Sequence, residues 1–290
     1  MKKISPILLG LSIAITGTSL AAAQDAVTMP KVLQITREYT KPYKAGAAHD
    51  KTESAFITAF TKAKFPAYYI GLNSLSGKSR ALYLTMYDSF AEWEKDNKIV
   101  EQNPALAAGL ERAGIADGEN LDGLDSVVYT RDEDLSYHPH ADISHARYME
   151  IEVFKVHPGH DGEFRKAVKM VKEAYDKAGT NAHWAMFEIM FGADRGTFIA
   201  LSADNSLAEI DANLAAGKKF GDAMGEEGMK KLDGLTAAAM ESWHNELFTV
   251  NPRQSYVNPD WIKAEPDFWK PKPMAAPAAK PAAAEKKATP

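Results

Sequence analysis

The sequence predicts an α+β fold in which two ferredoxin-like βαββαβ units pack sheet to sheet. The first observation lies in residues 147–164, where Met149, Ile151 and Val153 alternate with glutamates, as in a strand with one polar face. A Pro-Gly turn and an amphipathic helix follow that strand. The second observation is that the same strand, turn and helix occupy residues 33–60. A chain of 290 residues, 45% of them hydrophobic, can bury the cores of two such units.

The elements follow from hydrophobic spacing, caps and turn residues. In the first unit the pattern predicts strands at 32–39, 68–75, 80–87 and 126–131, helices at 47–64, after Ser89 and at 104–113, and a loop at 114–123. In the second unit it predicts strands at 148–156, 183–191, 197–203 and 239–250, helices at 160–177 and 207–216, and a glycine-broken helix at 218–232. Each unit therefore has the strand and helix order of the split βαβ motif.

Short matches between the two units indicate a tandem repeat. DSFAE at 88–92 corresponds to NSLAE at 205–209, and Gly77 corresponds to Gly192. Each unit has a four-stranded sheet with helices on one face, so the other face needs a cover. Strand 184–191 is apolar at nearly every position, which predicts that both of its faces are buried. The sheet of the other unit is the simplest cover.

Five segments are expected along the chain. They are a signal peptide at 1–23, a first repeat at 30–140, a second repeat at 145–252, an aromatic and proline-rich arm at 253–270, and a disordered Ala/Pro/Lys tail at 271–290. The signal peptide is predicted from Lys2 and Lys3, the short apolar run at 7–15 and the alanines at 21–23. We therefore expect a periplasmic or secreted protein whose mature chain does not insert into a membrane.

The charge and cysteine content of the sequence limit the kinds of partner and of covalent cross-link that we expect. Removal of the two signal-peptide lysines changes the formal net charge from −5 to −7 (−5 − 2), so the mature chain is acidic and nucleic acid is not an expected partner. The sequence contains no cysteine, so the fold depends on its core and not on disulfides, and no lipobox cysteine adjoins the cleavage site.

The turn between the first strand and first helix of the second repeat has residues that resemble those of a known superfamily. Pro158, Gly159, His160 and Phe164, with the element order and the repeat, resemble the dimeric α+β barrel superfamily, which includes antibiotic-biosynthesis-type monooxygenases, stress-responsive barrel proteins and NIPSNAP-like proteins. The resemblance covers residues 32–250. It implies a pseudo-dimeric α+β barrel closed within one chain, with a pocket in each unit. Members include cofactor-free oxygenases, haem enzymes, isomerases and non-catalytic binders, so the resemblance implies no single reaction.

Aromatic and polar side chains recur at matching strand positions in the two repeats. Alignment of the second strands pairs Tyr69 with Trp184 and Asn73 with Glu188, and period two places each pair on one face. His183 adjoins Trp184 at the start of its strand, where an aromatic-lined pocket mouth or simple packing would both fit. An aromatic pocket of this kind suits a small apolar ligand.

Glutamates on the same face of the second unit's sheet suggest a cation site or a site of acid–base chemistry. If this face points into the barrel, Glu150, Glu152 and Glu188 share a confined space that His244 could join. Carboxylates buried together raise each other's pKa or bind a cation, and a histidine with carboxylates suits a hard or borderline metal or acid–base work. The candidate ligand-binding residues are Tyr69, Asn73, Glu150, Glu152, His183, Trp184, Glu188 and His244.

The plainer alternatives stay open. The glutamates can instead pair with arginines in a wet barrel interior, namely Arg80, Arg131 or Arg147. The loop histidines at 138, 140 and 145 lack zinc-finger spacing and are typical of solvated positions, so no metal ligands are assigned and the cofactor stays unknown. No nucleophile elbow, P-loop or dinucleotide-binding glycine motif is present.

Two functions from different classes remain. The first is an exported protein that binds a small apolar molecule in a barrel pocket, with cofactor-free oxygenase- or isomerase-like activity as its possible reaction. The second is a non-enzymatic cell-envelope interaction protein that uses the arm and tail as contacts. The sequence does not decide whether the protein is an enzyme. The fused repeats predict a self-contained barrel that is a monomer or a weak oligomer.

Overall fold

The computed structural model describes residues 30–139, 143–180 and 182–270. The predicted signal peptide at 1–23, His140 and the predicted tail at 271–290 lie outside these residues. None of the helices within the described ranges combines the length and the apolar character that a membrane crossing requires.

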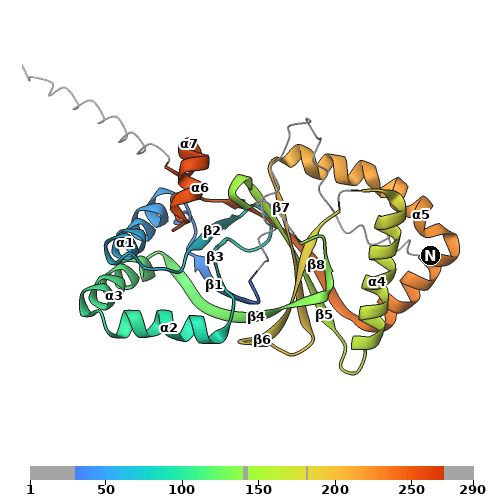
Figure 1. The fold of residues 1–290 in the computed structure, drawn as a ribbon, viewed down its shortest axis with the longest axis horizontal. Helices are drawn as coiled ribbons and strands as arrows, with labels where there is room; N and C mark the ends of the chain where they lie inside the picture. Colours follow the sequence, from blue (N-terminus) through green and yellow to red (C-terminus); the bar gives the residue numbers. More distant parts are fainter. Residues whose placement is uncertain (1–29, 140–142, 181, 271–290) are drawn as a thin grey trace, which may run out of the picture.

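Eight antiparallel strands of the one chain close a barrel in the order β1-β3-β2-β8-β5-β7-β6-β4 (Figure 1). The strands are β1 (Val32–Thr40), β2 (Tyr69–Ser74), β3 (Arg80–Tyr87), β4 (Leu121–Tyr137), β5 (Tyr148–Val156), β6 (Trp184–Phe191), β7 (Thr197–Asp204) and β8 (Met240–Val250). The first half has the order β4-β1-β3-β2 and the second half the order β8-β5-β7-β6, so corresponding strands occupy corresponding places. Two seams, β2–β8 and β4–β6, join the halves. The predicted α+β class is thus confirmed as a closed eight-stranded barrel.

Helices cover the outside of each half. They are α1 (Ala47–Ala63), α2 (Phe90–Glu101), α3 (Pro104–Gly118), α4 (Asp161–Ala178) and α5 (Leu207–Ala239), with a short 3-10 turn η1 (Ile143–His145) between the halves. In Figure 1, α1, α2 and α3 lie outside the first half, and α4 and α5 lie outside the second. Ser89 caps α2 by accepting a hydrogen bond from the amide of Glu92, as the sequence predicts.

The inside of the barrel is an apolar core. Its buried side chains come from all eight strands and include Leu33, Leu72, Phe187 and Phe248. A second core lies between the second half of the barrel and the helices α4 and α5, where Phe164 contacts the sheet. Alternation along each strand thus sends one side chain to the barrel interior and the next to the helices.

The first unit departs from the prediction between its last helix and last strand. The loop expected at 114–123 is wrong: α3 continues to Gly118, and β4 begins at Leu121 and runs to Tyr137. Helix packing outweighs the low helix propensity of glycine here, since Ala113 and Asp117, on either side of Gly114 in the sequence, are buried. This extension of α3 matters because it carries Asp117 into the protein interior.

The helix expected at 207–216 and the glycine-broken helix expected at 218–232 join without a gap, and the expected glycine break is present as a kink. The helix α5 runs from Leu207 to Ala239, with a kink at Gly225, whose φ of 71° and ψ of 165° are not helical. Glycine reaches this positive φ without steric cost, so the kink falls there and the flanking turns continue.

The C-terminal arm docks on the first half of the barrel. Tyr69 and Tyr256 exchange backbone hydrogen bonds, so the arm pairs with the start of β2. Two short helices follow, α6 (Pro259–Ala264) and α7 (Pro266–Trp269), and the indole of Trp269 donates to the Ser144 carbonyl at 2.9 Å. The described part of the arm therefore packs against its own chain.

Candidate metal centre

The polar face of the strands points towards the helices and not into the barrel. In β5, Ile151 belongs to the barrel core, so Glu150 and Glu152 lie on the opposite side. Trp184 likewise packs in the core beneath α4 and α5. The expectation that this face lines the barrel interior is wrong, because apolar side chains of all eight strands fill that space.

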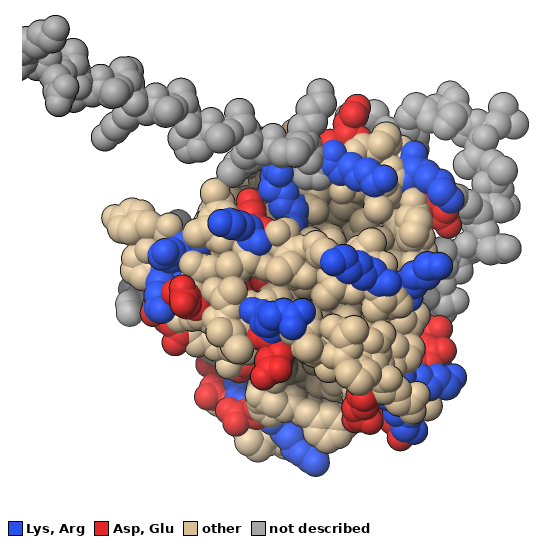
Figure 2. Space-filling view, turned by 90° about the vertical axis from the view of Figure 1, so that its left-hand side faces the viewer, with Lys and Arg blue, Asp and Glu red and all other residues tan. Residues whose placement is uncertain are grey.

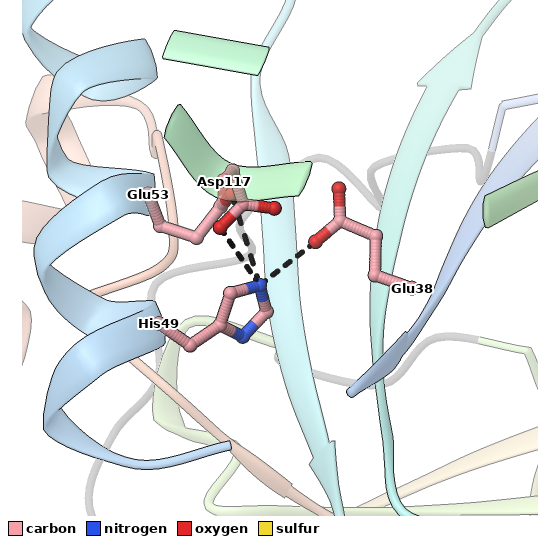
Figure 3. A group of neighbouring side chains, drawn as sticks. All are labelled: Glu38, His49, Glu53 and Asp117. Carbon is pink, nitrogen blue, oxygen red and sulfur yellow. Dashed lines mark hydrogen bonds and ion pairs between the residues drawn. The ribbon is translucent and has the colours of Figure 1, made fainter. Parts of the chain in front are cut away.

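In the first half, four ionisable side chains meet between the sheet and its helices (Figure 3). His49 and Glu53 come from α1, Glu38 from β1, and Asp117 from α3. All four are buried, with no side chain of the four more than 9% exposed. One nitrogen or oxygen atom of each residue lies within 4.8 Å of the corresponding atom of every other.

Local structure explains how these residues meet. His49 and Glu53 are four residues apart in α1, so they share one helix face. Glu38 lies on the helix-facing side of β1, and Asp117 lies in the last turn of α3, which packs beside α1. Three elements thus deliver one imidazole and three carboxyl groups to one point.

The carboxylates converge on one ring nitrogen. His49 Nε2 lies 2.9 Å from Glu38 Oε2, 3.4 Å from Asp117 Oδ1 and 4.0 Å from Glu53 Oε1. Two buried carboxylate oxygens, Glu53 Oε1 and Asp117 Oδ2, have no hydrogen-bond partner among the described residues. A buried polar atom without a partner costs about 1–3 kcal/mol, so the protein interior does not satisfy this cluster by itself.

The pKa values reflect this crowding. Burial lowers the pKa of His49, but hydrogen bonds with Asp117 and Glu38 outweigh it and raise the pKa to about 10. Burial, followed by the charges of Glu38 and Asp117, raises the pKa of Glu53 to about 9. Burial also raises the pKa of Tyr83, beside Glu53, well above its ordinary value. The cluster thus retains protons at neutral pH that a bound cation would displace.

The arm supplies the next layer of contacts. Gln254 is fully buried, and its Nε2 lies 3.3 Å from His49 Nδ1 and donates to Asp50 Oδ1 at 2.9 Å. Asn251 Nδ2 also donates to Asp50 Oδ1 at 2.9 Å. The Gln254 amide, held by its bond to Asp50, lies against the imidazole and orients the ring, as groups around a metal-binding histidine commonly do.

On the other side, Asp117 is held by a short polar chain. The Thr52 hydroxyl donates to Asp117 Oδ1, and Asn120 Nδ2 donates to Thr52 Oγ1 at 3.2 Å. These contacts fix one oxygen of Asp117 and leave Oδ2 free of partners within the described chain. Such orientation of a carboxylate by neighbouring groups is typical of metal sites.

Two of the predicted residues, Glu150 and Glu152, meet in a different cluster in the second half. Glu150 Oε2 accepts a hydrogen bond from Asn245 Nδ2 at 3.0 Å. The carboxyl of Asp204 is also part of this cluster: burial, and then the charge of Glu150, raises the pKa of Asp204 to about 8. Burial, and then the charge of Glu150, raises the pKa of Glu152 to about 8.

The remaining predicted polar residues lie apart from both clusters. Glu188 pairs with Arg165 at 3.7 Å, and its side chain is 44% exposed. His244 has an exposed side chain and lies 3.8 Å from Glu246. Asn73 lies at the β2–β8 seam opposite Thr249. The structure does not bring Glu188 or His244 to Glu150.

The predicted aromatic residues have separate surroundings. Tyr69 adjoins the His49 cluster, where burial and the charges of Glu53 and Glu38 raise its pKa well above the ordinary value. Trp184 donates its indole N–H to the Leu135 carbonyl at 2.8 Å, and with His183 it lines a cavity of about 20 Å³.

A second cavity, of about 30 Å³, also has Trp184 in its wall. These volumes correspond to about one water molecule each, far below the ~300–1,000 Å³ of ligand pockets. Neither cavity accounts for the predicted apolar ligand.

Sequence reasoning missed Glu38, His49, Glu53 and Asp117. A usable signal was the His49–Glu53 pair at helical spacing on a face that must pack on the sheet. Asp117 gave no such signal, since its position was assigned to a loop.

Comparisons with known proteins bear on the overall arrangement only. The sequence matches no known protein family and no curated protein. Among solved structures, a protein assigned as a monooxygenase from Fusobacterium nucleatum is 13% identical with a TM-score of 0.49, over 77% of this chain and 93% of that one. An anthrone oxidase-like protein is 12% identical with a TM-score of 0.49, over 76% and 91% of the two chains. A chlorite dismutase variant from Candidatus Nitrospira defluvii is 8% identical with a TM-score of 0.47, over 82% and 97%. At these values the similarities transfer no residue role or activity to this chain.

Proposed function

We propose that this protein binds one divalent first-row metal ion at the centre formed by Glu38, His49, Glu53 and Asp117. The observation that carries the proposal is the convergence of four buried ligand atoms within 4.8 Å of one another. The two carboxylate oxygens without partners support it, because a cation would satisfy both at once.

The donor set favours a particular class of ion. One imidazole nitrogen with three carboxylate oxygens is harder than a typical zinc site and contains no thiolate, which favours Mn²⁺ or Fe²⁺. Three carboxylates and a dication leave a net charge of −1 at the centre with neutral His49, which a buried site tolerates far better than three unpaired carboxylates. Four protein ligands leave two positions of an octahedral ion for other groups.

The sequence-based expectations extend this proposal. A redox-active ion at such a centre would supply oxygenase-like chemistry, in place of the cofactor-free chemistry expected first. Lys2, Lys3 and the alanines at 21–23 support action outside the cytoplasm after export. A shared origin of the two halves as a tandem repeat is supported by their corresponding strand order.

The test is metal binding by the mature chain, produced without a histidine tag. After removal of metal with EDTA, titration with Mn²⁺ should show one tight site and a rise in Tm, because an ion that binds only the folded state stabilises it. The variants Glu53→Gln and Asp117→Asn keep side-chain shape and remove a ligand charge. Each should lower Mn²⁺ affinity by tenfold or more.

The matched control is Asp204→Asn, which neutralises a buried carboxyl in the second half of the barrel. This variant should keep wild-type Mn²⁺ affinity. The alternative is that the cluster is a proton-sharing network that only joins α1 to α3. That alternative predicts no Tm rise with Mn²⁺ or Fe²⁺ in a folded wild-type protein, and such a result would overturn the metal proposal.

A further inference from the structure

A long groove runs over the outer surface between α1 and α3. Its volume is about 750 Å³, which lies within the ~300–1,000 Å³ range of small-molecule sites. Its apolar wall is made of alanines of both helices with Leu106 and Gly109, and short polar side chains such as Thr58 and Asn103 lie among them. Because most of these side chains are small, they leave space between the helices that larger ones would fill.

Cations line the groove. Lys51 and Lys62 of α1 and Arg112 of α3 are exposed, and none of them has an ion-pair partner in the part of the chain that the structure describes. Figure 2 looks onto this side of the molecule, where Lys and Arg side chains spread across the middle of the face and most Asp and Glu side chains lie nearer its edges. This cationic lining contrasts with the negative net charge of the whole chain.

The groove adjoins the candidate metal centre. Thr52 lines the groove and donates its hydroxyl proton to Asp117, one of the four candidate ligands. Ala113 and Ala116 line the groove within the helical turn that ends at Asp117. The wall of the groove is thus one side chain away from the buried cluster.

We propose that the groove binds an anionic amphiphile, of which a medium-chain alkyl carboxylate is the simplest member. The carboxylate would interact with Lys51, Lys62 and Arg112, and the alkyl chain would cover the alanine wall. The proposed metal centre borders this groove. The statement that the bound alkyl chain lies near a metal ion therefore rests on the proposed function, whereas the statement that the groove binds the amphiphile is independent of it.

The probe is octanoate, with 1-octanol as the uncharged molecule of equal chain length. Wild-type protein should bind octanoate more tightly than octanol by tenfold or more. The triple variant Lys51→Glu, Lys62→Glu, Arg112→Glu should weaken octanoate binding at least tenfold and leave octanol binding within twofold. The control Lys166→Glu, Lys169→Glu, Lys230→Glu makes the same charge change at exposed positions of α4 and α5 and should leave both affinities unchanged.

A second variant pair tests the groove without a charge change. Ala55→Leu and Ala116→Leu are exposed positions in the groove wall, so the larger side chains narrow the groove without disturbing a core. Each should weaken octanoate binding severalfold. Equal octanoate affinity in the wild type, the triple variant and the filled variants would overturn the inference, as would binding to anionic lipid vesicles with no binding of free octanoate.

Paramagnetic broadening separates this inference from the metal proposal. In Mn²⁺-loaded protein, the octanoate proton signals should broaden, and the broadening should disappear in Glu53→Gln protein that still binds octanoate. If octanoate binds and Mn²⁺ does not, the metal proposal fails and the groove stands. If Mn²⁺ binds and octanoate does not, the groove inference fails and the metal centre stands.

Discussion

His49 is surrounded by more acidic groups than one imidazolium can neutralise. Glu38, Glu53 and Asp117 all lie within 4.0 Å of its Nε2, and all are buried. A buried ion pair repays its desolvation cost only when each remaining polar atom is satisfied. The unpartnered oxygens of Glu53 and Asp117 fail this condition, which is why a cation explains the arrangement better than an internal salt bridge.

Gln254 should tune the metal affinity although it is not a ligand. Replacement by Leu removes the amide next to His49 Nδ1 and leaves Asp50 with its Asn251 partner. We expect Mn²⁺ affinity to fall by about 10–100-fold, since groups that orient a metal-bound imidazole contribute that much. The check is Mn²⁺ titration followed by Tm with and without metal. A purely structural role would lower both Tm values equally and leave the increment caused by Mn²⁺ intact.

Glu152 should make stability fall as pH rises. Burial and then Glu150 raise its folded pKa from its ordinary 4.5 to about 8, so the folded state holds a proton that the unfolded state has lost. The free energy of unfolding should therefore decrease between pH 4.5 and about pH 8, by up to about 1.4 kcal/mol per pH unit for this group. Denaturant unfolding across this window should show a shallower slope for Glu152→Gln.

The control for the pH experiment is Glu173→Gln, at an exposed position of α4. Its stability profile should overlay that of the wild type. Identical slopes for the wild type and Glu152→Gln would show that this carboxyl does not carry the effect.

The residues of the candidate centre show where sequence reasoning ends. His49 and Glu53 share a helix face by spacing alone, and that much is readable from sequence. Their contact with Asp117 depends on how α3 packs against α1, which no local pattern encodes. Glu188 does not join Glu150 and Glu152 for a related reason. The period of two in a strand places these side chains on one face of the sheet, but it does not show which layer covers that face.

At the scale of elements, the C-terminal arm and α1 jointly position the candidate metal centre, since Gln254 of the arm contacts His49 and Asp50 of α1. Gly71 of β2 makes this docking possible, because a Cβ there would lie 2.5 Å from the Gln254 carbonyl oxygen. The amide of Gly71 also receives support from the Ser255 hydroxyl, which accepts its hydrogen bond at 2.9 Å. Backbone atoms of the two segments thus touch directly.

Gly71→Ala should displace the arm. The added methyl group has no space against the arm backbone, so we expect a loss of about 1–3 kcal/mol in the free energy of unfolding and weaker Mn²⁺ binding. Hydrogen exchange should show lower protection of the Tyr256 amide, which bonds to Tyr69. Gly162→Ala in α4 is the control, since a Cβ there contacts nothing within 4 Å. Equal stability and protection in Gly71→Ala would contradict the docking argument.

Most elements were predictable because each has a strong periodic pattern bounded by turns or caps. The strands β3 and β5 match the predicted ranges, 80–87 and 148–156. The main boundary error lies at Gly114, where the low helix propensity of glycine indicated an end and α3 continues to Gly118. Tertiary contact and not local preference decided this boundary. The break predicted within 218–232 is present as the kink at Gly225.

At the scale of the whole molecule, closure of the barrel was predictable from the unsatisfied sheet faces. A four-stranded sheet with helices on one side must cover the other, and the second half of the same chain does so. The sequence could not predict the function of the layer outside the barrel. That layer differs between halves: the first holds the His49 cluster and the groove, and the second holds an apolar core with the buried carboxyls of Glu150, Glu152 and Asp204 beside it.

Closure within one chain predicts a self-contained barrel, as a monomer or a weak oligomer, and the β2–β8 seam allows a direct test. Asn73 and Thr249 are opposite residues across this seam, and the natural sequence has no cysteine. In Asn73→Cys, Thr249→Cys protein, oxidation should form a disulfide inside one chain, because facing residues of antiparallel strands have Cα atoms about 4.5–5.5 Å apart. Non-reducing gels should show a faster-migrating monomer, and light scattering the mass of one chain. The single-cysteine variants serve as controls, and a covalent dimer from the double variant alone would show that the seam forms between two chains.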